Sequence, residues 1–146
     1  MTPAADSAGY SGMPLAQKLG LKDGQRVMFI SLPKELKELR KSRHFIEIAE
    51  AGWETFTDGD PGYDVIHGFT TSRAVLEVAA RPLLDSIDRD GSIWISWPKK
   101  ASKVPTDITE DVIREVILPI GLVDVKVAAV NEIWSGLKLV IRKELR

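Results

Sequence analysis

Cysteine is absent from the chain, and histidine occurs only twice among its 146 residues. Without cysteine the protein has no disulfide bond, thiolate metal site or cysteine nucleophile. The two histidines, His44 and His67, are far apart in the sequence and indicate neither a metal cluster nor a catalytic triad. His67 lies in an apolar run, so we expect it to be hydrogen-bonded in the core.

A net excess of charge is also lacking, because the formal charge is −1 at pH 7. This balance gives no global attraction to nucleic acid or to an anionic membrane. Nucleic acid is therefore a disfavoured partner unless a local basic patch exists.

Long apolar segments and targeting signals are missing as well. Runs such as residues 27–30 are far shorter than a membrane span, and the start of the chain, MTPAADSAGYSG, has neither the basic segment nor the apolar core of a signal peptide. We expect a cytoplasmic protein without membrane contact. It would consist of a flexible arm at residues 1–12 and a single domain at residues 13–146.

What the sequence does contain is a regular succession of short apolar strands and amphipathic helices. We expect strands at 26–31, 63–69 and 92–97, and helices at 14–19, 34–41, 70–87 and from 107 onward. Residues 44–57 suit either a strand or a helix, and the alternation in FIEIAE favours a strand. Pro82 is expected to kink or break its helix, and DRDG at 88–91 is expected to form a turn.

The last part of the chain predicts an antiparallel hairpin. VDVKVAAV alternates so that Asp124 and Lys126 share one face and the valines the other, LKLVIRKE repeats the alternation, and NEIWSG separates the two runs. Together the elements predict an α/β fold of three layers, with a mostly parallel, Rossmann-like sheet of about six strands that ends in this hairpin. This is the architecture of methyltransferase-like folds, which by itself carries little functional weight.

In such a sheet, ligands bind at the carboxyl ends of the parallel strands. The expected ends are 31–33, 70–73 and 97–103, joined at the same edge by the hairpin loop 131–136. Lysines follow the strand 92–97 and precede a helix, where backbone amides favour an anion. The candidate anion ligands are Lys99, Lys100, Ser102 and Lys103. In the alternative interpretation these lysines bind nothing and are merely exposed to solvent where the strand ends. Asp107 and Glu110 would then form a capping box at the start of the helix.

Two residues of the NEIWSG loop complete this candidate site. Trp134 would stack on a ligand, dock on a partner or, as the more ordinary outcome, fold back on its own core. Glu132 is the carboxylate that the topology brings near the lysines, as an acid–base residue or as their ion-pair partner.

A nucleotide cofactor is disfavoured by the turn after the first strand. That turn, ISLPKEL, contains no glycine, and none occurs between Gly24 and Gly52, although close approach of backbone to a cofactor normally requires one. Glu50 would be placed to accept hydrogen bonds from the ribose hydroxyls only if residues 44–57 form a strand. We therefore expect no cofactor, with S-adenosylmethionine disfavoured. The turn TDGDPGYD has calcium-like spacing but an incomplete pattern, so no metal is expected.

Four segments resemble a family of short bacterial proteins known as a domain of unknown function, DUF3052. They are YSGMPLAQKLGLKDGQRV, YDVIHGFTTSRAVLE, WISWPKKASKVPTDITEDVIREV and GLVDVKVAAVNEIWSGLKLVIR. The resemblance covers about four fifths of the chain, is most specific in WPKKAS and WSGLK, and implies a small Rossmann-like bacterial protein without an assigned reaction or catalytic residues.

Three hypotheses about function follow. The first is a binding module for a small anionic or phosphorylated ligand at the carboxyl edge of the sheet. The alternatives are a truncated S-adenosylmethionine-dependent methyltransferase-like enzyme and a protein-interaction or homodimerisation domain.

Overall fold

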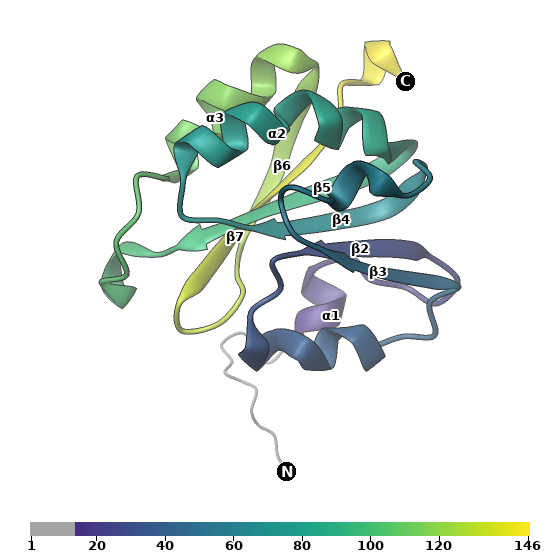
Figure 1. Ribbon diagram of the computed structural model, residues 1–146, viewed down its shortest axis with the longest axis horizontal. Helices are drawn as coiled ribbons and strands as arrows, with labels where there is room; N and C mark the ends of the chain where they lie inside the picture. The colour runs from purple at the N-terminus through teal and green to yellow at the C-terminus, as the bar shows by residue number, and fades with distance from the viewer. Residues whose placement is uncertain (1–13) are drawn as a thin grey trace.

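The computed structural model describes residues 14–146, so the arm expected at residues 1–12 lies outside the described part. Six strands form one sheet with the order β3-β2-β4-β5-β7-β6 (Figure 1). Their bounds are β2 (Arg26–Ile30), β3 (Glu47–Ala51), β4 (Tyr63–Phe69), β5 (Ile87–Pro98), β6 (Leu122–Ala129) and β7 (Trp134–Ile141). The first four pair in parallel, whereas β7 is antiparallel to both β5 and β6. The predicted fold class is confirmed.

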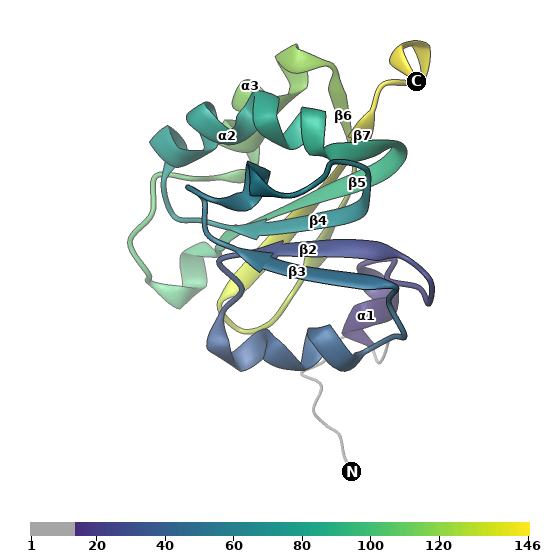
Figure 2. The same cartoon turned by 45° about the vertical axis from the view of Figure 1, so that its right-hand side comes forward.

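Helices cover both faces of the sheet and make three layers (Figures 1 and 2). On one face lie α2 (Arg73–Ser86), α3 (Glu110–Ile117), η2 (Phe56–Asp58) and η4 (Leu118–Ile120), and on the other lie α1 (Leu15–Lys18) and η1 (Lys34–Lys41). Two further short helices, η3 (Lys100–Ser102) and η5 (Lys143–Leu145), lie in loops. No helix in residues 14–146 is both long and apolar enough to cross a membrane.

Each face has its own apolar core. Ile66, Leu76 and Ile113 are fully buried between the sheet and α2 and α3. Trp94 is fully buried on the α1 side, where its Nε1 donates a hydrogen bond to the carbonyl oxygen of Leu19 at 3.0 Å. A buried indole N–H needs such an acceptor, so this bond fixes the end of α1 against the sheet.

The uncertain segment 44–57 contains a strand, which excludes its helical alternative. β3 pairs in parallel with β2 from Arg26↔Glu47 to Ile30↔Ala51. The predicted helix at 34–41 exists but has 3₁₀ geometry. Its two buried side chains, Leu36 and Leu39, are three residues apart, the repeat of a helix with three residues per turn.

A break at Pro82 and a turn at 88–91 do not occur. Of the kink or break expected at Pro82, the break is excluded, because α2 continues to Ser86. The carbonyl that loses its donor belongs to Val78, a residue that is 80% exposed, so the gap lies on the solvent side of the helix. The predicted turn at 88–91 instead belongs to β5, where a register irregularity opposite Tyr63 accommodates the extra residues.

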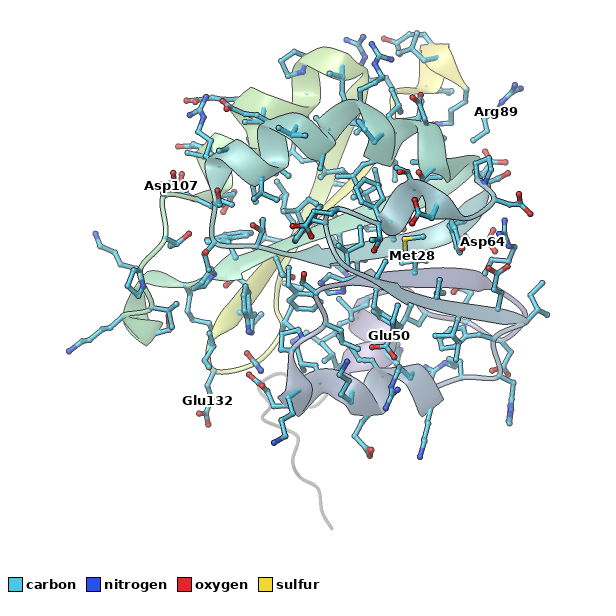
Figure 3. The ribbon with its side chains drawn as sticks, in the orientation of Figure 1. Met28, Glu50, Asp64, Arg89, Asp107 and Glu132 are labelled. Atoms are coloured by element: carbon cyan, nitrogen blue, oxygen red, sulfur yellow. The ribbon has the colours of Figure 1, made fainter. Side chains whose placement is uncertain are left out.

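The predicted capping box of α3 is also wrong. Thr109 is the N-cap, and its hydroxyl accepts a hydrogen bond from the backbone N of Val112 at 3.2 Å. Asp107 instead accepts from the backbone N of Arg73 at 2.7 Å and so serves the first turn of α2. Figure 3 shows Asp107 in the loop that leads to α3, close to the start of α2.

The hairpin is antiparallel as predicted, but a bulge in its first strand changes which face of the sheet the following side chains point to. The register shifts between Asp124 and Lys126, and a bulge of this kind leaves the extra residue Val125 unpaired. Asp124 therefore faces α3, where it pairs with Arg114 at 3.0 Å. Lys126 faces the opposite side, with its Nζ 6.0 Å from the Trp94 ring centroid.

Candidate functional site

The strand order reverses between β2 and β4. From β2 the chain moves outward to β3 and then returns to β4 on the other side of β2. A crevice opens at the carboxyl ends of strands at such a switch point and is the usual ligand site of open α/β sheets. Ile30, the last residue of β2, pairs with Gly68 near the end of β4, so Ser31 and Thr70 flank this switch point.

Ser31 provides an unusual backbone turn at the first of these strand ends. Its φ of +56° is in the left-handed region, where glycine is favoured, and its backbone N donates to the carbonyl oxygen of Ala51 at 2.9 Å. A left-handed non-glycine residue costs about 1–2 kcal/mol, and strain of this kind clusters at functional sites. The turn therefore adopts the backbone conformation of a glycine turn without a glycine.

Glu50 places a carboxylate at the end of the neighbouring strand β3. Its Oε1 accepts from Nζ of Lys37 at 2.6 Å, and its Oε2 accepts from Nη1 of Arg40 at 2.9 Å. The hydrogen bond from Lys37, together with that from Arg40, lowers the pKa of Glu50. An ionised carboxylate has about four lone-pair positions, so each oxygen can still accept another hydrogen bond. Figure 3 shows Glu50 between β3 and η1.

Trp53 packs against the end of β4, next to the switch point. It follows β3, and its Nε1 donates to the carbonyl oxygen of Phe69 at 2.9 Å. A Cβ on Gly68 would lie 2.5 Å from Cη2 of Trp53, so the half-buried indole lies directly on the glycine backbone. Residue patterns did not reveal this role; the sequence-level signal is a tryptophan and a glycine at the ends of two neighbouring strands.

Trp134 folds back on the core, the ordinary outcome of the alternatives above. It is the first residue of β7 rather than a loop tip, and its ring packs edge-on against Phe69 at a centroid distance of 5.3 Å. Asn131 fixes the preceding turn, because its Oδ1 accepts from the backbone N of Trp134 at 2.8 Å. Phe69 thus contacts both tryptophans.

The lysine loop adjoins this region, as the topology predicted. The backbone N of Lys99 donates to the carbonyl oxygen of Ile133 at 2.7 Å and joins the exit of β5 to the hairpin loop. Lys99, Lys100 and Lys103 surround the one-turn helix η3, whereas α3 begins only at Glu110. These lysines therefore do not lie at the N-terminus of α3.

The other two candidate ligands have local structural surroundings. The hydroxyl of Ser102 donates to the carbonyl oxygen of Lys99 at 2.7 Å and accepts from the backbone N of Val104 at 3.2 Å. Glu132 is exposed at the tip of the hairpin loop (Figure 3), and within residues 14–146 it forms no ion pair with the lysines of η3.

His67 lies behind the switch point in the sheet. It is 1% exposed, its Nε2 is 2.7 Å from the hydroxyl oxygen of Ser96, and its ring stacks on Phe69 at 4.2 Å. Burial lowers the pKa of His67 to about 3, so the imidazole is neutral at physiological pH. The expected hydrogen-bonded core position is confirmed.

The turn with calcium-like spacing uses its oxygens to hold Arg26. Asp64 Oδ2 accepts from the backbone N of Arg26 at 2.8 Å, and the carbonyl oxygen of Pro61 accepts from its Nη1 at 2.8 Å. Across residues 14–146, histidine and acidic side chains form no group of three or more that could hold a metal ion.

No protein-family profile matches this chain, and no curated protein sequence matches it. Solved structures do match. An S-adenosylmethionine-dependent methyltransferase from Aquifex aeolicus is similar with a TM-score of 0.66 and 16% identity over 87% of both chains. A putative sarcosine dimethylglycine methyltransferase from Galdieria sulphuraria gives 0.59 and 11%, covering 86% of this chain and 83% of the other. A TehB-like S-adenosylmethionine-dependent methyltransferase from Corynebacterium glutamicum gives 0.56 and 12%, covering 88% and 85%.

These similarities show that the chain has the Rossmann-like fold of S-adenosylmethionine-dependent methyltransferases. The expectation of no cofactor, with S-adenosylmethionine disfavoured, is therefore corrected: proteins that share this sheet are named for that cofactor. Two features of the structure give the physical reason. Ser31 makes the left-handed turn although glycine is missing, and Glu50 does lie at the end of a strand, β3.

Proposed function

We propose that this chain is a methyltransferase-like protein that binds S-adenosylmethionine at the switch point between β2 and β4. The observation that carries the proposal is the strained turn at Ser31 beside the ionised carboxylate of Glu50, at adjacent carboxyl ends of a methyltransferase-type sheet. When bound, this cofactor supplies a methyl group on a positively charged sulfur.

The residues around the switch point have distinct roles in this proposal. Glu50 accepts hydrogen bonds from the ribose hydroxyls, while Lys37 and Arg40 hold its side chain in place. The exposed backbone turn at Ser31 lets the cofactor approach the chain closely. Trp53, which is half-buried, supplies apolar surface for the adenine ring, since aromatic side chains combine large contact area with few rotatable bonds.

Calorimetric titration with S-adenosylmethionine and S-adenosylhomocysteine tests the proposal. We expect saturable binding to the wild type, and Glu50→Ala to weaken it about 10- to 100-fold, because a hydrogen bond to a charged group contributes about 1.5–3 kcal/mol. Glu47→Ala is the matched control: it removes a carboxylate from the same strand that is also paired with an arginine, Arg26, but lies at the amino end.

Two results would contradict the proposal. One is the absence of binding by the wild type at millimolar ligand. The other is equal weakening by Glu47→Ala and Glu50→Ala, which would place the ligand away from the carboxyl edge. A thermal-shift measurement provides an independent check, because a ligand at 100 times its dissociation constant stabilises the folded state by about 2.7 kcal/mol.

A further inference from the structure

Glu50 lies at the centre of a cluster of charged side chains beside the switch point. Its Oε1 accepts a hydrogen bond from Nζ of Lys37 at 2.6 Å, and its Oε2 accepts one from Nη1 of Arg40 at 2.9 Å. Lys37 and Arg40 are three residues apart on η1, and side chains with this spacing lie one above the other in a 3₁₀ helix. One carboxylate therefore binds two cations that reach it from the same helix. We name these three residues the Glu50 cluster.

The Glu50 cluster adjoins the turn at Ser31. Glu50 pairs with Phe29 in the β2–β3 ladder, and the backbone N of Ser31 donates to the carbonyl oxygen of Ala51, the residue after Glu50, at 2.9 Å. The three side chains of the cluster are between 32% and 40% exposed. A ligand that approaches the Ser31 turn can therefore also contact the cluster.

The two cations are held in place by more than Glu50. Nε of Arg40 donates to the carbonyl oxygen of Lys37 at 3.2 Å, so the guanidinium is also bonded to the backbone of η1. Leu36 and Leu39, which precede the two cations in the sequence, are buried and fix η1 against the sheet. Within residues 14–146 neither cation has another carboxylate partner. Removing the carboxylate therefore leaves two neighbouring cations without a negative partner.

The charge of Glu50 determines which ribose the cluster accepts. An ionised carboxylate only accepts hydrogen bonds, and free ribose hydroxyls donate them. A phosphate group on the ribose has a charge of about −1.5 to −2 at pH 7, and it would lie against the negative charge of Glu50, a juxtaposition that disfavours binding. Lys37 and Arg40 offset this repulsion only in part, because both are bonded to Glu50.

We propose that Glu50 determines specificity at the switch point by selecting an adenosine ligand with free ribose hydroxyls over one phosphorylated at the 2′ or 3′ position. Without the carboxylate, Lys37 and Arg40 bind that phosphate, since ammonium and guanidinium groups are the usual phosphate ligands of proteins. The inference rests on the proposed binding of S-adenosylmethionine at this site. It adds a function for the two cations of η1 and a class of ligand that the wild type excludes.

Calorimetric titration of wild type and Glu50→Gln with adenosine and with its 2′-, 3′- and 5′-monophosphates tests the inference. The wild type should bind adenosine more tightly than the 2′- and 3′-monophosphates. Glu50→Gln should reverse this order and bind the 2′- or 3′-monophosphate about 10- to 100-fold more tightly than the wild type does, as expected for a new charge-assisted hydrogen bond. The 5′-monophosphate has its phosphate away from the hydroxyls that Glu50 contacts, so its affinity should change much less.

Matched variants separate the position of the charge from its removal. Glu47→Gln removes the same charge at the amino end of β3 and should leave the order of the ligands unchanged. Glu50→Asp keeps the charge and should retain the wild-type order. The double variant Glu50→Gln, Arg40→Gln lacks one of the two cations and should lose about 10-fold or more of the gained phosphate affinity. Circular dichroism verifies that each variant is folded.

Equal gains for the 2′-, 3′- and 5′-monophosphates in Glu50→Gln would overturn the inference, because the change in net charge alone would then explain them. Unchanged affinity of Glu50→Gln for the 2′- and 3′-monophosphates would overturn it as well. If adenosine and S-adenosylmethionine still bind the wild type, either result leaves the proposed function intact. If neither ligand binds the wild type at millimolar concentration, the proposed function and this inference are both wrong.

Discussion

Replacing His67 by glutamine should remove a large part of the acid sensitivity of this protein. The imidazole is buried, contacts the Ser96 hydroxyl at 2.7 Å, and has its pKa lowered to about 3 by burial. In the unfolded chain the pKa of histidine is about 6.5. Between these two values the unfolded state binds the additional proton, so acidification favours unfolding. The stabilisation is present above about pH 6.5 and is lost as the pH falls toward about 3.

The magnitude follows from the two pKa values. Complete titration costs about 5 kcal/mol, at about 1.4 kcal/mol for each unit of difference between the folded and unfolded pKa. Over the accessible range from about pH 7 to about pH 5, the folded state loses about 2 kcal/mol from this single group. His67→Gln keeps a polar side chain that can hydrogen-bond with Ser96 but cannot titrate.

Urea denaturation followed by tryptophan fluorescence measures this effect. The free energy of unfolding is obtained at both pH values for wild type and His67→Gln, and the wild type should lose about 2 kcal/mol more than the variant. Carboxylates titrate in both proteins and cancel in the difference. Parallel loss in the two proteins would refute the reasoning, and so would an NMR titration in which the His67 ring of the folded protein has the ordinary histidine pKa of about 6.5.

Further substitutions test the strand ends and the lysine loop of the candidate site. Ser31→Gly removes the Cβ at a φ of +56° and, because that conformation costs a non-glycine residue about 1–2 kcal/mol, should raise the free energy of unfolding by up to that amount; a clear loss of stability in urea denaturation would contradict the described turn. Gly68→Ala puts a methyl group 2.5 Å from Trp53, so it should cost about 1–3 kcal/mol and shift the tryptophan emission to longer wavelength, and an unchanged spectrum would argue against the contact. For the anion-binding hypothesis, sulfate and phosphate should raise the melting temperature of wild type but not of Lys100→Ala with Lys103→Ala. Equal stabilisation of both proteins would exclude the loop as an anion site.

The architecture was predictable because its signals are local. Alternation in FIEIAE identified β3, and the alternating runs on either side of NEIWSG identified the hairpin. Once the strands were placed, the rule that ligands bind at carboxyl ends located the edge at which Ser31, Thr70 and Lys99 lie. These inferences needed only side-chain periodicity and chain connectivity.

The details of the site depend on contacts between distant residues and were not predictable in the same way. The left-handed turn at Ser31 could not be predicted, because the residue at this position is not a glycine. Trp53 acquires its position by packing on Gly68, fifteen residues later in the chain. The alternation around Lys126 reads the same with or without a bulge, so only the pairing with β7 reveals that this lysine faces Trp94.

Mapping of backbone amide shifts in ¹⁵N-labelled protein on addition of S-adenosylmethionine tests most directly whether the switch point binds this cofactor. We expect saturable shifts at Ser31, Gly52 and Thr70, which lie at the carboxyl ends of β2, β3 and β4. In Glu50→Ala the same residues should reach half-saturation only at a cofactor concentration about 10- to 100-fold higher. Absence of shifts at saturating cofactor, or shifts confined to residues away from this edge, would contradict the account.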